Sequence, residues 1–575
     1  MSRRASFSLL SRAKLRPRTC SPRLFTTRPG ASTLNLTAQQ RSTFSSSSKA
    51  EVTHQNGARS WTLIVAAATA LCIASFGAGA LLFKPSSSSN HSTSRLGAPI
   101  SYASHSEMLA AADEIAQLLG SDWVSFDSDV LEHHGYSEWS TSNSPVRAVA
   151  VVYPKSTADV SNIARVCTKW RVPMIPYGAG SSVEGNASQP HSGICINLSL
   201  MDKIVEFHPE DMDVVVQPGV NWVDLNARIA HAGLFAPLDP SPTATIGGMV
   251  STNCSGTNAM RYGTMKDWVL SVTVVMPDGT VVKTRRRPRK TSAGYNLTSL
   301  FVGAEGTLGI VTEATLKLAP IPQDTRVAAV AFGSIREAAA AASKLIRSGI
   351  PLAALELMDD VQMKMLNEHG SEAVRKWNWA EKPTLFIRFS GTTEAVESDA
   401  RRASEMVRQL TRGSSEFRFA RSKQDETDLW AARKEALFTM LRIRPEGTEI
   451  WSTDVAVPLS RLAEIIDLSK KECGQLGIFA SVIGHVGDGN FHVAMMYDPQ
   501  DTNQKQAVAK CVQNMMRRAI DMGGTVSGEH AIGIGKKQCL VDELGQDTIN
   551  LMRDLKRAVD PLGIMNPGKV FDLTT

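Results

Sequence analysis

The stretch MIPYGAGSS, residues 174–182, places a short apolar strand directly before a glycine-rich loop. A strand that enters Gly-x-Gly can begin a dinucleotide-binding motif, but a helix must follow, with an acidic residue about twenty positions further on. Here the next residues are VEGNASQP, which place Gly, Asn and Pro where that helix should begin. The required acidic residue is also missing. The stretch therefore argues against a Rossmann fold and predicts a loop whose backbone N–H groups cradle a pyrophosphate.

The chain on both sides of this loop predicts a mixed domain. Residues 146–153 are rich in β-branched side chains and predict a strand, and Ser156 or Thr157 can cap the amphipathic helix that follows. Residues 269–282 predict a hairpin that turns at residues 277–279, Pro-Asp-Gly. Strands and helices therefore surround the glycine-rich loop.

Two further glycine-rich segments follow. They are PSPTATIGGMVSTNCSG at residues 240–256 and GAEGTLGIVTE at residues 303–313, the second after a predicted strand at residues 300–302. Both combine glycines with small side chains, which lets the backbone approach a bulky ligand closely. An ordinary turn would explain any one of these segments. Three of them within about 140 residues predict a cofactor site.

The order YGAGSS, PTATIGG, GAEGTLGIVTEA resembles the FAD-binding domain of the vanillyl-alcohol-oxidase type flavoproteins. The resemblance implies an α+β fold with a two-part FAD-binding domain at residues 105–322. An α/β cap domain with an antiparallel sheet would follow at residues 323–535, and a C-terminal segment, residues 536–575, would return to the flavin domain. The first loop has no histidine to tether the cofactor, so the FAD should be non-covalent. The residues expected to contact FAD are Tyr177, Gly178, Ala179, Gly180, Ser181, Ser182, Pro242, Thr243, Thr245, Gly247, Gly248, Ser251, Asn253, Gly256, Glu305, Gly309, Ile310 and Asn566.

Residues 484–492, GHVGDGNFH, place two histidines symmetrically around an Asp-Gly pair. Asp-Gly favours a two-residue type I′ turn between antiparallel strands, which would set His485 directly opposite His492. Opposed residues have Cβ atoms about 4.5–5.5 Å apart on one face of the sheet, so both imidazoles could bind one metal ion. A polar pair on a solvated sheet is the alternative.

The segment GGTVSGEHAIGIGKK contains the adjacent residues Glu529 and His530. Adjacent side chains point in different directions on most extended backbones, so Glu529 could complete a two-histidine, one-carboxylate metal site while His530 faces a substrate. GHVGDGNFH and GEHAIGIGK resemble the C-terminal domain of the FAD-linked D-2-hydroxyacid dehydrogenases. The resemblance implies that His485, His492 and Glu529 bind zinc or manganese and that His530 is the base. Ala531 departs from the family, which usually has Gly at this position.

The substrate is predicted from three further positions. Trp430-x-x-Arg433 resembles the family's arginine that clamps the substrate carboxylate, a task that suits a planar guanidinium. Arg433 could also be one more charge on a helix. The hydroxyglutarate branch of the family has Asn and Thr where this sequence has Ala494 and Leu437. Apolar groups at both positions favour a short substrate tail such as methyl.

The resemblance therefore implies an enzyme that oxidises D-lactate to pyruvate and passes electrons to cytochrome c. D-2-hydroxyglutarate or glycolate is the alternative substrate for the same site. A transferase of the alkyl-glycerone-phosphate synthase type, or a membrane-anchored flavoprotein scaffold, is a more distant reading. The eight cysteines form no C-x-x-C pair, so neither a zinc ribbon nor a haem attachment site is predicted.

The N-terminal region has the composition of a targeting sequence. Residues 1–60 hold eleven Lys and Arg and one acid, a net of +10, which leaves −4 for the rest of a chain with a formal charge of +6. This predicts a mitochondrial transit peptide and gives no reason to expect a nucleic acid partner. Residues 61–83 run without a charge and predict a transmembrane anchor, followed by a serine-rich linker at residues 84–104. This layout predicts an inner-membrane protein that faces the intermembrane space, with the matrix as the alternative.

Overall fold

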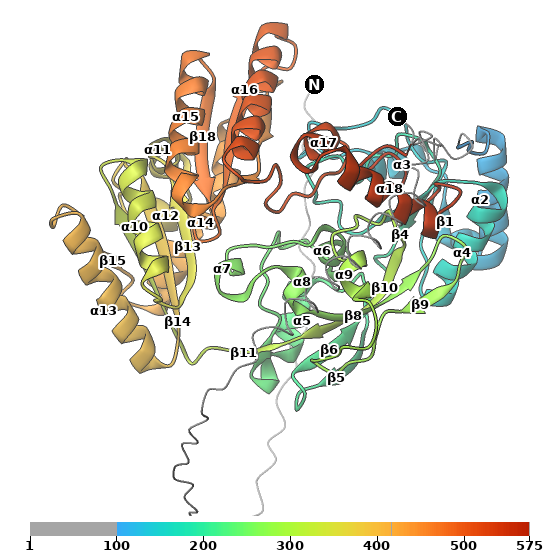
Figure 1. Ribbon diagram of the computed structural model, residues 1–575, viewed down its shortest axis with the longest axis horizontal. Coiled ribbons are helices and arrows are strands. Elements are labelled where there is room, and N and C mark those ends of the chain that lie inside the picture. The colour runs from blue at the N-terminus through green and yellow to red at the C-terminus, as the bar shows by residue number, and fades with distance from the viewer. Residues whose placement is uncertain (1–99, 416, 574–575) are drawn as a thin grey trace, which may run out of the picture. The chain divides into compact units, whose positions relative to one another are not determined.

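The structure is a computed structural model that describes residues 100–415 and 417–573 (Figure 1). The predicted transit peptide and transmembrane anchor, and residues 84–99 of the linker, lie outside the described residues. Within the described part of the chain, none of the helices is both long enough and apolar enough to span a bilayer.

The first part of the flavin domain is a small sheet covered by helices. Its order is β1-β2-β4-β3, and β2 and β3 each run parallel to β4. The predicted helix is present and Ser156 caps it, because its side chain accepts a hydrogen bond from the Asp159 N–H. The strand predicted at residues 146–153 is shorter than expected. The elements are α2 His105–Leu119, β1 Val124–Ser125, α3 Ser128–Gly135, β2 Ala150–Val152, α4 Thr157–Trp170, β3 Met174–Tyr177 and β4 Ile194–Asn197.

The second part of the flavin domain is an antiparallel sheet of order β5-β6-β10-β8-β9. The predicted hairpin is confirmed, since β8 pairs with β9 across the Pro-Asp-Gly turn. The strand predicted at residues 300–302 is wrong. Asn296 caps a short helix there, α9, because its side chain accepts from the Ser299 N–H, and the helix buries Phe301. The elements are β5 Ile204–His208, β6 Asp213–Val216, α5 Trp222–Ile229, α6 Ile246–Thr252, α7 Ala259–Tyr262, β8 Val269–Val275, β9 Val281–Lys283, α9 Leu297–Phe301 and β10 Ile310–Lys317.

The cap domain is built on an antiparallel sheet of order β15-β12-β14-β13-β18-β19-β16, with β17 paired to β19. Helices α10, α13, α15 and α16 bury one face of this sheet, and α11, α12 and α14 bury the other. Figure 1 shows the sheet between these two sets of helices. The elements are β12 Asp324–Ala331, α10 Ile335–Arg347, β13 Leu352–Met358, α11 Asp360–His369, α12 Glu372–Arg375, β14 Thr384–Gly391, α13 Thr393–Leu410, β15 Arg418–Phe419, α14 Lys423–Ile443, β16 Glu449–Ser452, β17 Val455–Ala456, α15 Leu462–Gln475, β18 Phe479–Gly484, β19 Asn490–Tyr497 and α16 Thr502–Asp521.

The histidine hairpin has a different register from the one predicted. Strand β18 pairs with β19 so that Ile483, not His485, lies opposite His492. The turn is longer than two residues because Gly489 has a positive φ of 80° while Asp488 does not, and type I′ needs both. The shift is two residues, and a strand alternates its faces every residue, so His485 keeps the expected side.

The C-terminal segment returns to the flavin domain, as the predicted fold requires. Helices α17 (Lys537–Leu544) and α18 (Gln546–Val559) precede a short bridge in which Met565 pairs with Met174 of β3. The backbone N–H of Asn566 donates to the Met174 carbonyl at 2.8 Å. The chain end therefore lies against the strand that leads into the first glycine-rich loop.

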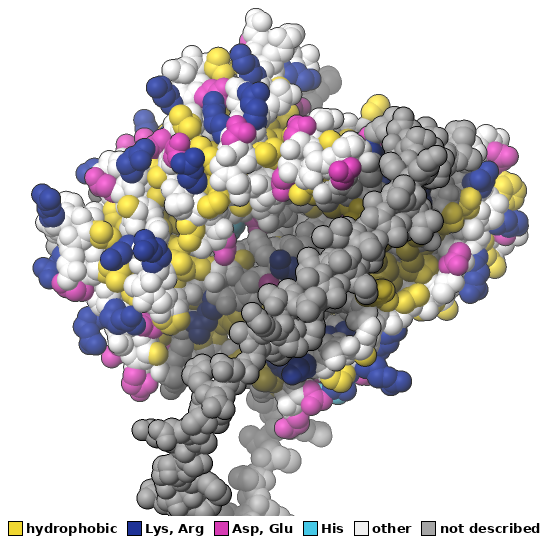
Figure 2. Space-filling view, in the orientation of Figure 1, with side chains coloured by type: hydrophobic (Ala, Val, Ile, Leu, Met, Phe, Trp, Pro, Cys, Tyr) yellow, Lys and Arg dark blue, Asp and Glu magenta, His cyan; other side chains and the backbone are white. Residues whose placement is uncertain are grey.

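The basic run at residues 285–290 follows β9 and is partly neutralised within the protein. Arg287 pairs with Asp211 and Asp213, and Arg289 donates to the Met212 carbonyl at 3.2 Å. Over the cap helices, Figure 2 shows Lys and Arg interspersed with Asp and Glu. The run thus ties the segment after β9 to the β5–β6 connection within the second part of the flavin domain.

Candidate active site

A single cavity of about 890 Å³ is lined both by the glycine-rich segments and by the α14 face of the cap sheet. Of the residues predicted to contact FAD, all but Thr243 and Asn253 line it. Asn253 instead ends α6 in a left-handed conformation, and its side chain accepts hydrogen bonds from Thr264 and Lys266. Thr243 is exposed and within hydrogen-bonding distance of Ser241. These two residues hold the loop and do not face the cavity.

The glycine-rich segments fit a large planar or phosphate-bearing ligand such as FAD. A Cβ on Gly178 would lie 2.9 Å from the Thr245 hydroxyl, and one on Gly247 would lie 2.6 Å from a side-chain carbon of Pro218. Both distances are shorter than real Cβ contacts, so these positions need glycine. The Thr245 hydroxyl is buried without a hydrogen-bond partner among the described residues. A bound phosphate or ribose oxygen would satisfy it.

The predicted metal ligands converge in the cap domain. The Nε2 atoms of His485 and His492 lie 3.1 and 3.2 Å from the same oxygen of Glu529, Oε1. All three residues line the cavity. Two imidazoles and a carboxylate at this separation match the ligand set that zinc or manganese accepts.

The outer nitrogen of each histidine is already engaged. His485 Nδ1 donates to Glu356 Oε1 at 2.9 Å, and His492 Nδ1 donates to the Thr453 carbonyl at 3.0 Å. These bonds leave the Nε2 lone pairs for a metal ion, which is the arrangement of metal-binding histidines. Burial opposes protonation of His485, but Glu356 and Glu529 raise its pKa well above the usual value. The surroundings therefore favour positive charge at this point.

Glu356 on β13 was missed by the sequence analysis. Its side chain is only 1% exposed, and it bridges two site residues, because Oε1 accepts from His485 and Oε2 accepts from Arg433 Nε at 2.7 Å. Burial raises the pKa of Glu356, but His485 and Arg433 lower it more, so the carboxylate stays ionised. The available signal was one acid inside the apolar strand LAALELM, since a buried acid needs partners.

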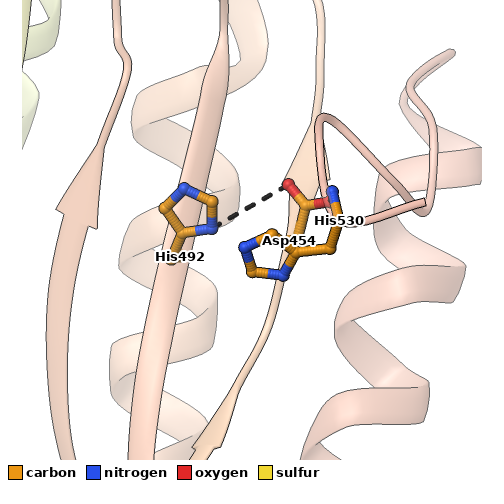
Figure 3. Close-up of side chains that lie close together, drawn as sticks. All are labelled: Asp454, His492 and His530. Carbon is orange, nitrogen blue, oxygen red and sulfur yellow. Dashed lines mark hydrogen bonds and ion pairs between the residues drawn. The ribbon is translucent and has the colours of Figure 1, made fainter. Parts of the chain in front are cut away.

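His530 lies beside the predicted metal ligands, and together with Asp454 and His492 it forms a second group whose ligand atoms lie within 4.8 Å of one another. Its ring stacks on His492 with 4.9 Å between centroids and 12° between planes (Figure 3). Its Nδ1 is buried and has no hydrogen-bond partner among the described residues. Burial lowers the pKa of His530 to about 4, against the opposing charge of Asp454. The imidazole is therefore neutral near pH 7 and can accept a proton.

Asp454, also missed, fixes the loop that carries Glu529 and His530. Its Oδ2 accepts the backbone N–H groups of Glu529 at 3.0 Å and His530 at 2.8 Å. Lys536, which is 1% exposed, lies 3.4 Å from Asp454 and 3.1 Å from Glu184 of the flavin domain. Burial raises the pKa of Glu184 to about 7, although Lys536 opposes this. A chain of buried ionisable groups thus runs from Glu184, just after the first glycine-rich loop, to the backbone of His530.

Glu305 connects this loop to the flavin domain. Glu305, predicted to contact FAD, lines the cavity, but its carboxylate also accepts the N–H groups of Ile532 and Gly533, both at 2.8 Å.

The backbone of the loop is strained at Ala531. This residue has a φ of 66°, in the left-handed region that costs a non-glycine residue about 1 kcal/mol or more. The family glycine would relieve this strain.

The comparisons agree with this architecture. Residues 148–285 match the FAD binding domain family, and residues 321–570 match the C-terminal domain of FAD linked oxidases. In fold, the chain is similar to 4-ethylphenol oxidase from Gulosibacter chungangensis, with 18% identity and a TM-score of 0.67 over 83% of this chain and 99% of that one. Fold and domains therefore define an FAD-linked oxidase, and the predicted fold class is confirmed.

Similar proteins define the family more closely within this class. The chain is 41% identical over 483 residues to a mitochondrial D-lactate dehydrogenase [cytochrome] of Kluyveromyces lactis, covering 82% of this chain and 83% of that protein. It is 43% identical to the protein of the same name from Arabidopsis thaliana, covering 78% of each. The chain belongs to the family of these FAD-linked dehydrogenases.

Proposed function

We propose that the chain oxidises D-lactate to pyruvate with FAD as electron acceptor and a divalent metal ion, zinc or manganese, at the histidine site. The observation that carries this proposal is a convergence on the cavity that the glycine-rich segments line. Three potential metal-ligand atoms meet there beside a histidine, His530, whose Nδ1 has no hydrogen-bond partner among the described residues. The names of the relatives support the choice of substrate.

The bound groups would supply chemistry that side chains lack. When bound, FAD would supply an acceptor for the hydride from C2, and a metal ion would supply positive charge that lowers the pKa of the substrate hydroxyl. His485, His492 and Glu529 would hold the metal ion. The glycine-rich segments would hold the FAD.

The chain's own residues then perform three tasks. Arg433 binds the substrate carboxylate through the nitrogens that Glu356 leaves free. His530 takes the hydroxyl proton at a ring nitrogen, because its lowered pKa keeps it neutral. Leu437 and Ala494 line the cavity and would contact the methyl group.

The test is anaerobic titration of the purified full-length protein with D-lactate, L-lactate, glycolate and D-2-hydroxyglutarate, followed by flavin absorbance. We expect D-lactate to bleach the flavin fastest and to release pyruvate. If D-2-hydroxyglutarate or glycolate bleaches the flavin faster, that acid and not D-lactate is the substrate. Absence of bleaching by all four would support a transferase instead.

We further propose cytochrome c as the final electron acceptor, which the names of the relatives support. The −4 charge of residues 61–575 would attract a basic partner weakly. Reduction of cytochrome c by the enzyme and D-lactate should slow as salt is raised. No reduction at low salt would exclude this acceptor.

The composition of residues 1–83 supports mitochondrial import and an inner-membrane anchor at residues 61–83, with the body in the intermembrane space. Carbonate extraction should leave the full protein in the membrane and release a variant without residues 61–83. Protease added after rupture of the outer membrane alone should digest the body. Protection until the inner membrane is broken would place it in the matrix.

A further inference from the structure

Arg388 is a cavity residue that neither the sequence analysis nor the proposed mechanism uses. It lies on β14 directly opposite Ala354 of β13, two residues from Glu356. Opposed residues share a face and alternate residues of a strand do too, so Arg388 and Glu356 both face α14. The cavity lining contains Arg388 together with Arg433 and the metal ligands.

The guanidinium of Arg388 has no hydrogen-bond acceptor among the described residues, and no ion pair there includes it. Its central carbon lies 3.8 Å from the centroid of the Trp430 ring, so a cation–π contact orients it. The two carboxylates that act most strongly on the charge of Arg388, Asp239 and Glu356, already accept hydrogen bonds from other groups. Asp239 accepts from Thr257 and Asn258, and Glu356 is bound by His485 and Arg433.

This arrangement leaves a positive charge without a counter-anion. Burial lowers the pKa of Arg388, and Asp239 and Glu356 only partly oppose the effect. Arginine stays protonated in proteins, so the group remains a cation with free N–H donors. A buried charge without a partner is costly, and an anion that enters the cavity would remove that cost.

Arg388 and Arg433 border the same part of the cavity. The ring of Trp430 contacts the Arg388 guanidinium. Trp430 lies three residues before Arg433 on α14, and residues at this spacing are neighbours on a helix. Glu356, which binds Arg433, lies on the strand beside Arg388. Trp430 of α14 therefore orients the Arg388 guanidinium, and Glu356 of β13 orients the Arg433 guanidinium. Both contacts lie on the face of the sheet that α14 covers.

We propose that Arg388 and Arg433 form a two-armed clamp on the single carboxylate of the 2-hydroxyacid. The inference rests on the proposed function for the identity of the acid. Arg433 is fixed by an ion pair and Arg388 by an aromatic ring, so each presents donors without having to be ordered by the ligand.

The test compares Arg388→Met and Arg388→Lys with the wild-type enzyme. Arg326→Met is the matched control, because Arg326 lies 4.8 Å from the Phe419 ring on the same sheet and does not line the cavity. We expect Arg388→Met to raise KM for D-lactate and to weaken pyruvate binding, measured by calorimetry, by about 10- to 100-fold each, with a smaller change in kcat. Arg388→Lys should recover part of the loss because it keeps the charge but not the planar fork.

Three results would overturn the clamp. A loss confined to D-2-hydroxyglutarate, with D-lactate unchanged, would assign Arg388 to a second carboxylate. A shifted flavin reduction potential or lower FAD content in substrate-free Arg388→Met would assign it to the cofactor. Pyruvate binding equal to wild type would remove any anion role.

Calorimetry needs no turnover, so it separates this inference from the proposed function. A wild-type enzyme that D-lactate does not reduce contradicts the proposed function. If that enzyme still binds pyruvate and Arg388→Met weakens the binding, the clamp holds. If the wild-type enzyme binds no pyruvate, the clamp fails as well.

Discussion

The flavin-binding segments and the proposed metal-and-base centre, which comprises His485, His492, Glu529 and His530 with the charged residues around them, line one cavity but are built differently. The flavin-binding segments use glycines and small side chains, and their fit depends on what is missing, namely a Cβ at Gly178 or Gly247. The metal-and-base centre uses buried charges that hold one another, such as Glu356 between His485 and Arg433. The first region should therefore be sensitive to added volume, and the second to loss of charge at constant volume.

The two regions also differ in how far apart their partners lie in the sequence. His485 and Glu356 are 129 residues apart, and Arg433 and Glu356 are 77 apart. The flavin loop at residues 177–182 is one continuous stretch. Three continuous motifs taken together can therefore identify the flavin site, whereas the proposed metal-and-base centre depends on the packing of the whole cap sheet.

Replacement of the base should have the largest effect. His530→Asn keeps a polar side chain of similar size but cannot take the proton at neutral pH. We expect flavin reduction by D-lactate, measured by anaerobic stopped flow, to slow about 10²- to 10⁴-fold. FAD and metal content should not change.

The matched control is His231→Asn, a histidine of the flavin domain that does not line the cavity. It should leave the reduction rate unchanged. If His530→Asn keeps a rate close to wild type, the base lies elsewhere.

Charge loss at constant volume is the second test of the comparison. In Glu356→Gln, an amide cannot accept from both His485 and Arg433 as the carboxylate does. Because such carboxylates orient metal-binding histidines, we expect metal affinity to fall about 10- to 100-fold, measured by competition with a chelator. KM for D-lactate should rise in the same variant because Arg433 loses its partner.

Glu313→Gln is the control, since among the described residues the Glu313 carboxylate accepts only from the Thr273 hydroxyl in the flavin-domain sheet. Metal affinity in this variant should equal that of the wild-type protein. Unchanged metal affinity in Glu356→Gln would show that the centre does not depend on its charge network.

Added volume is the third test, and it should affect only the flavin-binding segments. Gly178→Ala would place a Cβ 2.9 Å from the Thr245 hydroxyl, so the loop must move. Overpacking costs about 1–3 kcal/mol, which predicts a loss in FAD affinity of about tenfold or more. Gly474→Ala is the control because, apart from the adjacent residues and the backbone of its own helix, no heavy atom of the described residues lies within 4 Å of the added carbon. Equal FAD content in the two variants would contradict the comparison.

The smallest expected effect concerns substrate choice. Ala494→Asn adds a polar group to a buried position in the cavity lining. We expect kcat/KM for D-lactate relative to D-2-hydroxyglutarate to fall about tenfold, because one small group in an apolar pocket shifts specificity by roughly this amount. An unchanged ratio would show that the substrate tail does not reach Ala494.

The histidine hairpin shows why a partly wrong prediction still located the site. The sequence predicted a two-residue turn, and the structure has a longer one that shifts the pairing from His485 to Ile483. Strand faces alternate with a period of two, so a shift of two residues leaves both histidines on the same side. A shift of one residue would have separated them.

The sequence by itself indicated the flavin-binding segments and three candidate metal-ligand positions, through backbone freedom at glycine and side-chain alternation, which are local properties. The class of fold was predicted from the resemblance of these motifs to a known family. Only the tertiary structure revealed the charged residues around them, namely Glu356, Asp454 and Lys536, and Arg388, which lies over the Trp430 ring. A buried charge is stable only beside partners, and folding brings those partners together from distant parts of the chain.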